Sequence, residues 1–375
     1  MFNRIRHMLI KEFLQMFRDP RMRMVVFGFP VIQMMVMAFA LNTDVMNIRT
    51  AVLDMDKSPA SRELIDTFTA GGYFKIIKDT DSWTELQSYL DQGDVRVLIA
   101  IPSGYAQDIK SGQTAKVQII SDGTDNNTSA IVSGYSERII REYSNRLLKN
   151  RLNAKGVTQP PIAMETVTRA FFNTNQESRY YYVPALIAVM LFIFSIMLTS
   201  IGIVKEKEIG TIEQVMVTPI RKIEFILGKT LPYMFTGYFT MTMMLIVARL
   251  IFGVTVKGNY PLLYFLTGIY LCGNMGVALV ISASATTQQQ ALLTSFLFIM
   301  PGVMLSGFMF PINNMPVVIQ YLTHINPIRW YLEILRGIVM KGVGIGVLWH
   351  QVMWQASLAV FFIFLAAKRF RKTLS

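Results

Sequence analysis

Gly228-Lys229-Thr230 is the triplet of this chain that comes nearest to a catalytic motif, because it has the residues that end a phosphate-binding loop. That loop needs a glycine five residues before Gly228, where this chain has Ile223, and it needs a preceding strand. Ser103-Gly104 and Ser133-Gly134 lack the neighbours of a nucleophile elbow. The three histidines are far apart in sequence and form no metal-ligand spacing. We therefore expect no catalytic residue, metal or cofactor in this chain.

A different group of polar residues lies between two long apolar runs, in the segment KEKEIGTIEQVMVTP from Lys205 to Pro219. Its charged side chains cannot lie in hydrocarbon, so the segment must protrude into water. Thr211, with Gln214 three residues later, fits a capping box that starts a short helix. The helix must end at Thr218-Pro219, because the residue before a proline avoids helical angles. Gly210 allows the sharp turn that aims this helix away from the preceding run.

This predicted loop helix has an apolar ridge with acidic residues around it, which suits docking into a groove on a soluble protein. Ile212, Val215 and Met216 form the ridge. The residues that we expect to take part in docking are Glu206, Glu208, Gly210, Thr211, Ile212, Glu213, Val215, Met216, Thr218 and Pro219. The alternative is an interfacial loop that has no partner.

The apolar runs on either side predict a polytopic membrane protein. The chain has 375 residues, 52% of them hydrophobic, and its mean hydropathy is +0.39, which is too apolar for an ordinary soluble protein. A helix needs about 20 apolar residues to cross a bilayer. Six stretches qualify as transmembrane helices, and only Arg249 is charged within them: 24–41, 183–204, 230–254, 261–285, 291–312 and 347–367.

The charges are distributed unevenly along the chain, and their distribution predicts an orientation. Residues 42–182 have 16 Lys and Arg against 17 Asp and Glu, a net charge of −1, whereas the rest has 20 against 7, a net charge of +13. The excess lies in 1–23, in 205–229 and after 367. Because basic loops stay in the cytoplasm, both termini are expected inside and residues 42–182 outside. An excess that follows the membrane spans argues against a nucleic-acid partner.

Residues 1–23 are predicted to form an amphipathic helix on the cytoplasmic face of the membrane. Apolar residues recur at helical spacing from Ile5 to Phe17, and basic residues occupy much of the remaining surface. Such a helix lies flat on anionic lipid. Asp19-Pro20 is expected to end it. The alternative is a set of scattered basic residues that only orient the first span.

Residues 42–182 alternate strand-like and helix-like stretches, which predicts an inserted extracytoplasmic α/β domain with a mainly parallel sheet. Strands are expected at 48–53, 74–78, 95–101 and 116–121, and a long helix at 127–149. Ser58-Pro59 has the residue types of a helix start. Ser82 is expected to cap the next helix, with Glu85 in the capping-box position.

The fifth apolar stretch is interrupted by Pro301, Gly302 and Gly307, so we expect a kinked helix. Residues 313–346 are too apolar for a free loop and too interrupted to cross the membrane. Within them, 315–322 and 328–339 are predicted to be short helices that re-enter or lie along the outer leaflet. The alternative is an ordinary outer loop that covers the bundle.

Three segments resemble, in the same order, the signatures of type-2 ATP-binding-cassette (ABC-2) exporter permeases. They are KEFLQMFRDPR from Lys11 to Arg21, KEKEIGTIEQVMVTPIRKIEFILGK from Lys205 to Lys229, and LSGFMFPINNMPVVIQYLTHINPIRWYLEILRGI from Leu305 to Ile338. Residues 95–102 and 116–123 are similar to the outer domain of the subgroup with a large insert after the first span. The resemblance covers essentially the whole chain and extends to bacterial multidrug-export permeases of the inner membrane.

The resemblance implies a dimer of permeases, with an identical or paralogous second copy, bound to two cytoplasmic ATPase subunits that hold ATP and Mg. The loop helix would be the coupling helix that contacts the ATPase. The family's N-terminal connecting helix would contain Lys11, Glu12, Phe13, Arg18, Asp19 and Pro20. Short helices that close the exit would contain Pro311, Pro316, Asn326, Pro327, Arg329 and Arg336. A periplasmic adaptor and an outer-membrane channel often complete such exporters.

The sequence thus predicts a non-catalytic permease subunit that exports a drug-like or amphiphilic substrate. The cargo pathway is expected between two copies, along the second and fifth spans, where soft and aromatic side chains are abundant. These are Met190, Phe192, Phe194, Met197, Phe298, Met300 and Met304. The alternative for each is plain packing or a lipid-facing surface. An exporter of ions or lipid-linked molecules, and a receptor or scaffold without cargo, remain open as alternative functions.

Overall fold

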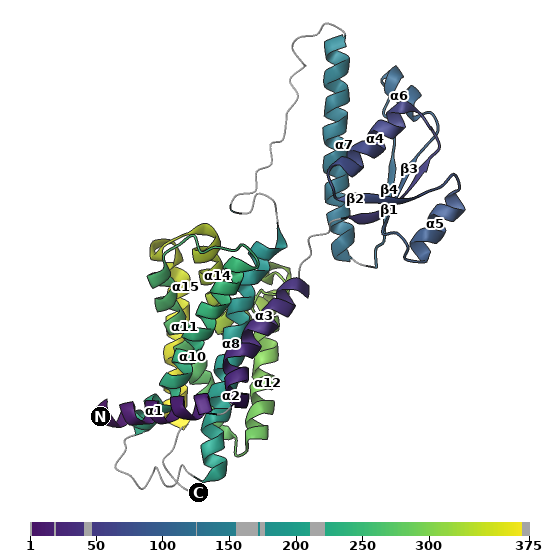
Figure 1. The fold of residues 1–375 in the computed structure, drawn as a ribbon. Helices are drawn as coiled ribbons and strands as arrows, with labels where there is room; N and C mark the ends of the chain where they lie inside the picture. Colours follow the sequence, from purple (N-terminus) through teal and green to yellow (C-terminus); the bar gives the residue numbers. More distant parts are fainter. Residues whose placement is uncertain are drawn as a thin grey trace. The chain divides into compact units, whose positions relative to one another are not determined.

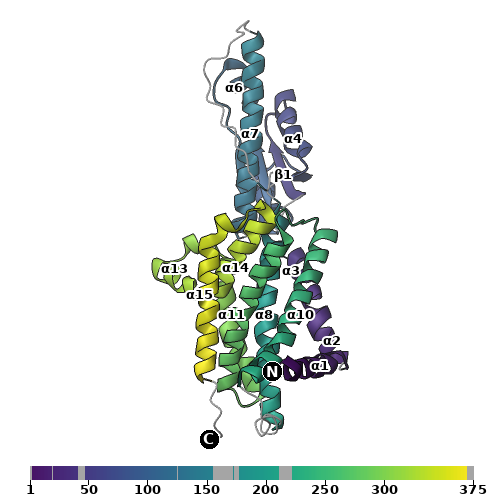
Figure 2. The same cartoon turned by 90° about the vertical axis from the view of Figure 1, so that its left-hand side faces the viewer.

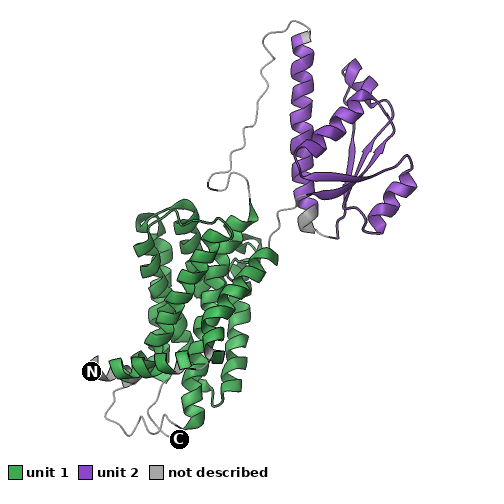
Figure 3. Cartoon of the chain, in the orientation of Figure 1, with its two compact units in different colours: residues 1–42, 169–375 green, residues 43–168 purple. Residues whose placement is uncertain are grey.

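The computed structural model describes residues 2–18, 20–40, 47–124, 126–154, 172, 177–210 and 222–369. The chain divides into two compact units (Figure 3). Unit 1 combines residues 1–42 with 169–375, and unit 2 is formed by residues 43–168.

Unit 1 is a bundle of helices. Its α-helices are α1 (Phe2–Arg18), α2 (Pro20–Arg23), α3 (Phe29–Ala40), α8 (Ser178–Ile209), α10 (Lys222–Leu250), α11 (Tyr260–Ser284), α12 (Gln288–Met304), α13 (Val317–Leu322), α14 (Pro327–Arg336) and α15 (Ile345–Arg369). Two π-helical stretches, Met24–Gly28 and Gly337–Lys341, and two short 3-10 turns, Ile312–Asn314 and Thr323–Ile325, complete it.

Helix α8 is the central element of unit 1. It packs against α3, α10, α11, α12 and α14, and two views show it inside the bundle (Figures 1 and 2). Every residue from Val183 to Phe192 is buried, which explains why this stretch is apolar all round rather than on one face. Helix α1 lies across the ends of the long helices instead of along them (Figures 1 and 2).

Two buried polar contacts connect α8 with its neighbours. The Asn274 side-chain amide on α11 donates to the Ser195 hydroxyl at 3.0 Å. The hydroxyls of Ser200 and Ser295, on α8 and α12, lie 2.8 Å apart. Hydrogen bonds of this kind hold helices together where no water competes for them.

Helices α11 and α15 are in close contact at Gly276. A Cβ atom added there would lie 2.8 Å from the backbone nitrogen of Ile363 and from the carbonyl carbon of Phe362. Both are backbone atoms and cannot rotate away, so only glycine allows this separation of the two helices.

Four helices among the described residues are long and apolar enough to cross a membrane: Ser178–Ile209, Ile226–Leu250, Tyr260–Ser284 and Ile345–Arg369. A shorter apolar helix covers Val26–Ala40. These helices correspond to five of the six expected stretches. Arg249 is the penultimate residue of α10 and is exposed, which agrees with its expected place at a helix end.

The fifth expected stretch, 291–312, is wrong at its carboxyl end. The α-helix there, α12, stops at Met304 after 17 residues, and the chain then turns, with Gly307 at a positive φ of 80°. Pro301 lies in the last turn of α12, where its missing N–H weakens the continuation. The first stretch also differs, because residues 24–28 form a π-helical turn before α3 begins.

Unit 2 contains a four-stranded sheet of strands β1 (Ile48–Asp54), β2 (Phe74–Asp79), β3 (Val97–Ile101) and β4 (Gln118–Ser121) in the order β2-β1-β3-β4. Strand β1 pairs parallel with β2 and β3, with Ile48 opposite Phe74 and Thr50 opposite Val97. Strand β4 runs antiparallel to β3. The strand positions and the mainly parallel pairing agree with the pattern in the sequence.

Helices cover both faces of this sheet. Helices α4 (Pro59–Ala70), α6 (Tyr105–Ser111) and the long α7 (Asn126–Ala154) pack on one apolar cluster, and α5 (Trp83–Asp91) packs on the other. Figure 1 shows α4 and α7 on the side of the strands opposite α5. Strand β3 is therefore buried at all five positions, as expected for a strand with helices on both faces.

The two predicted helix caps in unit 2 had different outcomes. Ser58 caps α4: its side chain accepts from the Ser61 N–H, and Ser61 returns a bond to the Ser58 N–H, each at 3.1 Å. Ser82 makes no side-chain cap. The Glu85 carboxylate instead accepts the Thr80 hydroxyl proton at 2.5 Å, so the predicted capping box is wrong because a closer hydroxyl competes for that carboxylate.

Candidate functional site

Three helices that are distant in sequence bring one lysine and two glutamates together where α1 crosses the bundle. The Lys229 Nζ on α10 lies 2.6 Å from the Glu12 Oε1 on α1 and 2.5 Å from the Glu206 Oε1 on α8. The Lys11 Nζ is 3.4 Å from the same Glu206 oxygen. We call Glu12, Lys229 and Glu206 the three-helix ion cluster.

The three members of the cluster are nearly inaccessible to solvent, with relative exposures of 5% for Glu12, 2% for Lys229 and 9% for Glu206. Burying ionised groups is unfavourable unless each is paired at close range. Two carboxylates share one buried ammonium, and Lys11, whose side chain is 53% exposed, adds positive charge at the rim. Removing Lys229 would leave two buried carboxylates without their shared cation, so the cluster connects all three helices through this one side chain.

Helix α1 approaches α10 closely enough to make this pairing because its partner has glycine at position 228. A Cβ on Gly228 would lie 2.9 Å from the Sδ of Met8. Further along, Met16 is buried with Tyr233 and Met275, and the rings of Phe13 and Phe235 lie 6.2 Å apart. The triplet Gly228-Lys229-Thr230 thus has a structural explanation: close helix contact, ion pairing, and a Thr230 hydroxyl bond to the Ile226 carbonyl at 2.9 Å.

The opposite side of α1 is apolar and exposed. Ile10, Leu14 and Phe17 have relative exposures of 44%, 50% and 53%. Arg6, Lys11 and Arg18 are exposed as well. A helix that pairs exposed apolar residues with basic ones has the composition of an interfacial helix.

The charged end of α8 is fixed residue by residue. The Lys207 Nζ donates to the Ala285 carbonyl at the end of α11, at 3.0 Å. The Glu208 carboxylate accepts from the backbone and side-chain N–H groups of Gln288 at 3.0 and 2.8 Å, at the start of α12. Glu206, between Lys205 and Lys207, points to the three-helix ion cluster. Glu206, Lys207 and Glu208 therefore connect α8 to α1, α10, α12 and the end of α11.

Gly210 ends α8 with a φ of 80°, in the left-handed region. Its N–H donates to the Lys207 carbonyl at 3.2 Å, as in other glycine-terminated helices. Glu206, Glu208 and Gly210 are thus the described members of the predicted docking set. The remaining members, Thr211, Ile212, Glu213, Val215, Met216, Thr218 and Pro219, lie outside the described residues.

The predicted N-terminal connecting residues are brought to the same end of the bundle. Lys11, Glu12 and Phe13 contact α8 or α10 through the bonds and rings described above. Arg18 is the last described residue of α1, and Pro20 is the first residue of α2. Asp19 lies outside the described residues.

The predicted short helices are present as α13 and α14, and the residues singled out there connect them to the bundle. The Asn326 side chain caps α14 by accepting from the Ile328 N–H at 3.2 Å, and it donates to the Gly302 carbonyl of α12 at 2.6 Å. Pro327 is the first residue of α14, and Pro316 precedes α13. Pro311, which precedes a 3-10 turn, is exposed.

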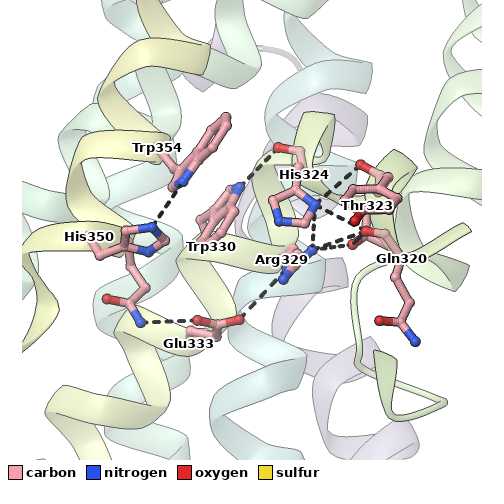
Figure 4. Close-up of polar contacts among 10 residues, drawn as sticks. Gln320, Thr323, His324, Arg329, Trp330, Glu333, His350 and Trp354 are labelled. Carbon is pink, nitrogen blue, oxygen red and sulfur yellow. Dashed lines mark hydrogen bonds and ion pairs between the residues drawn. The ribbon is translucent and has the colours of Figure 1, made fainter. Parts of the chain in front are cut away.

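Arg329 and Arg336 make different contacts on α14. Arg329 donates to the Gln320 carbonyl at 3.3 Å and to the Thr323 hydroxyl, and it contacts the His324 Nδ1 at 3.1 Å (Figure 4). The Arg336 guanidinium lies 3.7 Å from the centre of the Tyr181 ring of α8. The first arginine therefore fixes α13 to α14, and the second fixes α14 to the central helix.

Sequence reasoning missed an aromatic group on the other side of α14. The rings of Trp330 and Trp354 are stacked with centroids 5.5 Å apart and an interplanar angle of 2°. His324 and His350 lie against them, and the Trp330 Nε1 donates to the His324 carbonyl at 3.0 Å (Figure 4). The group Trp349, His350 and Trp354 on α15 is the available signal, and it does not identify the partner helix.

The arrangement favours mechanical transmission over chemistry. Its ions are paired and nearly inaccessible, and no nucleophile lies among them. Within the described ranges, no group of three or more His, Cys, Asp and Glu side chains is placed to hold a metal ion. What the site can do is transmit a displacement among α1, α8 and α10.

Comparison with known proteins gives the family. The model described as "ABC-2 family transporter protein" matches residues 20–368. "Probable multidrug ABC transporter permease YbhR" of Escherichia coli K12 is 30% identical over 352 residues, covering 94% of both chains. "Probable multidrug ABC transporter permease YbhS" is 30% identical over 367 residues, covering 96% of this chain and 95% of the relative. "Inner membrane transport permease YhhJ" is 25% identical and covers 86% of this chain and 85% of its own. The chain therefore belongs to the ABC-2 family of transporter proteins.

Proposed function

We propose that this chain is the transmembrane subunit of an ATP-driven exporter that moves a drug-like or amphiphilic substrate out of the cytoplasm or inner leaflet. Permeases of this family work with separate ATPase subunits, which hold the ATPase activity. In the proposed arrangement the chain crosses the bacterial inner membrane six times, with both termini inside and unit 2 outside. A second permease copy completes the pathway, and a periplasmic adaptor and an outer-membrane channel are further proposed partners.

The observation that carries this proposal is the three-helix ion cluster. The cluster includes one residue from each of the two helices that flank the predicted docking segment. Glu206 is in the last turn of α8, and Lys229 is in the first part of α10. A partner that pulls on this segment would move both α8 and α10. Since Lys229 is bonded to Glu12 as well as to Glu206, α1 must follow. Movement of the ATPase subunits would thereby reach three helices together.

The exposed face of α12 is the proposed cargo-contacting surface of this chain. Phe298, Met300 and Met304 have exposures of 38%, 47% and 50%. Met190, Phe192 and Phe194 of α8, by contrast, are buried in packing contacts, so the alternative reading of these three as core residues holds within the chain. Flexible thioethers and aromatic rings on an open surface suit apolar molecules of varied shape.

Coupling can be tested in proteoliposomes that contain the permease with its copurified ATPase. Glu206→Gln removes one charge of the cluster, and Lys205→Gln, at an exposed neighbouring position, is the matched control. We expect Glu206→Gln to lower stimulation of ATP hydrolysis by Hoechst 33342, and transport of that dye, about tenfold. The amount of assembled complex should not change. Equal stimulation in the two variants, with normal assembly, contradicts a coupling role for the cluster.

The orientation can be tested separately with an impermeant maleimide, because Cys272 is the one cysteine of the chain. In a Cys272→Ser background, Lys110→Cys should react in intact cells and Thr211→Cys only after the inner membrane is permeabilised. Labelling of Thr211→Cys in intact cells would overturn the proposed topology and with it the docking of a cytoplasmic ATPase.

A further inference from the structure

The sheet of unit 2 changes its winding direction between β1 and β3. From β1 the chain passes through α4 to β2 on one side, and then through α5 to β3 on the other side of β1. Helices α4 and α5 cover opposite faces. In open α/β sheets, ligands commonly bind beyond the carboxyl ends of the strands, at the place where the strand order reverses; here that place is next to β1.

A hollow of about 560 Å³ lies at that place. Its lining includes Met55, directly after β1, and Ala100, Ile101 and Pro102 at the end of β3. The lining is completed by Trp83, at the start of α5, and by residues 116–118, of which Gln118 is the first residue of β4. Pockets for small molecules have volumes of roughly 300–1,000 Å³, so the hollow has a suitable size for one.

The lining is apolar with one cationic group. Met55 and Trp83 are 49% and 39% exposed, although side chains of their size are usually covered in a folded domain. Among the described lining residues, the polar members are Lys116 and Gln118, and none has a carboxylate. A flat apolar body could contact the indole and the thioether while an anionic group meets the ammonium.

Two acidic residues close to the hollow, Asp54 and Asp56, accept hydrogen bonds from other groups of the chain. Both oxygens of Asp56 accept backbone hydrogen bonds at the start of α6, from Gly104 at 2.9 Å and Ala106 at 3.1 Å. Asp54 accepts from the Ser61 hydroxyl at 2.6 Å. Because the Asp56 carboxylate already occupies the N-terminus of α6, that helix end cannot bind a phosphate of a ligand.

We propose that this hollow binds a flat apolar molecule that carries one negative charge, such as an aromatic carboxylate. Trp83 and Met55 would contact the ring system, and Lys116 would pair with the carboxylate. The proposal depends on unit 2 alone, so it does not require the export role proposed above. If only the export role is correct, the dye-transport experiments succeed and the binding experiment below fails. If only the binding site is correct, the reverse result is expected.

The test uses the full chain in detergent, labelled with 5-fluorotryptophan. Trp83 is the one tryptophan of unit 2, and the others are Trp330, Trp349 and Trp354. The ¹⁹F resonance of Trp83 is identified by its loss in Trp83→Phe. Three probes differ only in charge: 2-naphthoate, neutral 2-naphthylmethanol and cationic 2-naphthylmethylammonium. We expect saturable shifts of the Trp83 resonance, with 2-naphthoate binding about tenfold more tightly than the neutral probe.

Lys116→Gln should weaken 2-naphthoate binding about tenfold and leave 2-naphthylmethanol binding unchanged. Lys110→Gln, at another exposed lysine of the same unit, should alter neither. The proposal is overturned if the Trp83 resonance does not shift saturably, or if the four resonances shift together, as they would when the probe only enters the micelle. It is equally overturned if the anion does not bind more tightly than the other two probes, a comparison that requires no variant to fold.

Discussion

The Lys229 ammonium lies 2.6 Å from the Glu12 carboxylate, across a sequence separation of 217 residues. This contact and its 2.5 Å counterpart with Glu206 make α1 part of the bundle instead of a separate surface helix. It follows that Glu12, in the first helix of the chain, contributes to the stability of α10.

We predict that Lys229→Gln destabilises the chain strongly. It leaves two buried carboxylates without their shared cation, a change that typically costs about 3–5 kcal/mol. The double variant Glu12→Gln/Lys229→Gln should lose less than the sum of the single variants, because the two groups interact directly. Thermal unfolding of the purified chain measures this. Lys11→Gln, whose side chain is 53% exposed and 3.4 Å from Glu206, is the control and should have a small effect. Additive losses would contradict a direct pair.

The end of α8 supplies a second prediction. Gly210 has a φ of 80°, which costs other residues about 1–2 kcal/mol and asparagine less. Gly210→Ala should let α8 continue and re-aim the loop that follows, so dye-stimulated ATP hydrolysis should fall. Gly210→Asn should retain most of it. If the two variants lose the same activity, the left-handed turn is not what matters at this position.

The contact between α11 and α15 predicts opposite effects for two glycine-to-alanine changes. Gly276→Ala places a methyl group 2.8 Å from the backbone of α15, and such overpacking costs about 1–3 kcal/mol. Gly346→Ala lies in the first turn of α15, where a Cβ meets no atom within 4 Å. There alanine meets no clash and has the higher helix propensity. The melting temperature should therefore fall for Gly276→Ala and should not fall for Gly346→Ala. A stable Gly276→Ala protein would mean that the helices separate easily.

A pH dependence is expected at the start of α6. The Ser58 hydrogen bond, followed by those from the Ala106 and Gly104 backbone, lowers the pKa of Asp56 below its usual 3.8, although partial burial acts in the opposite direction. A lowered folded-state pKa stabilises the fold above pH 3.8, and this contribution is lost as the pH falls through the folded-state value.

Asp56→Asn should accordingly speed hydrogen exchange of residues 103–112 at pH 6, and the difference from the native chain should shrink by about pH 3. Exchange mass spectrometry, corrected for intrinsic rates at each pH, measures this. Asp66→Asn, at an exposed position of α4, should change nothing. A difference of equal size at both pH values would assign the effect to geometry and not to charge.

Local patterns predicted local structure well. Ser58-Pro59 starts α4, and the alternating stretches of unit 2 form its strands, because each signal acts within a few residues. Where two local partners compete, the pattern is ambiguous. Glu85 has the spacing of a capping box, yet it bonds to Thr80, two residues before the expected cap.

Contacts between distant segments could not be predicted in the same way. Lys229 belongs to a triplet that sequence reasoning dismissed, and nothing near it in the chain indicates Glu12 or Glu206 as partners. The stacking of Trp330 on Trp354 depends on how α14 meets α15. The carboxyl end of α12 was misplaced because an apolar composition continues past Met304, where the backbone has already turned.

Helix α8 has 32 residues, so it is about 48 Å long and exceeds the roughly 30 Å of a bilayer core. It also packs against five other helices. A close-packed rod of this kind has no freedom to slide alone, because its neighbours would have to open gaps around it. If α8 tilts at Glu206, the helices packed on it must therefore tilt with it. The movement then reaches the other end of α8, where Tyr181 contacts Arg336 of α14.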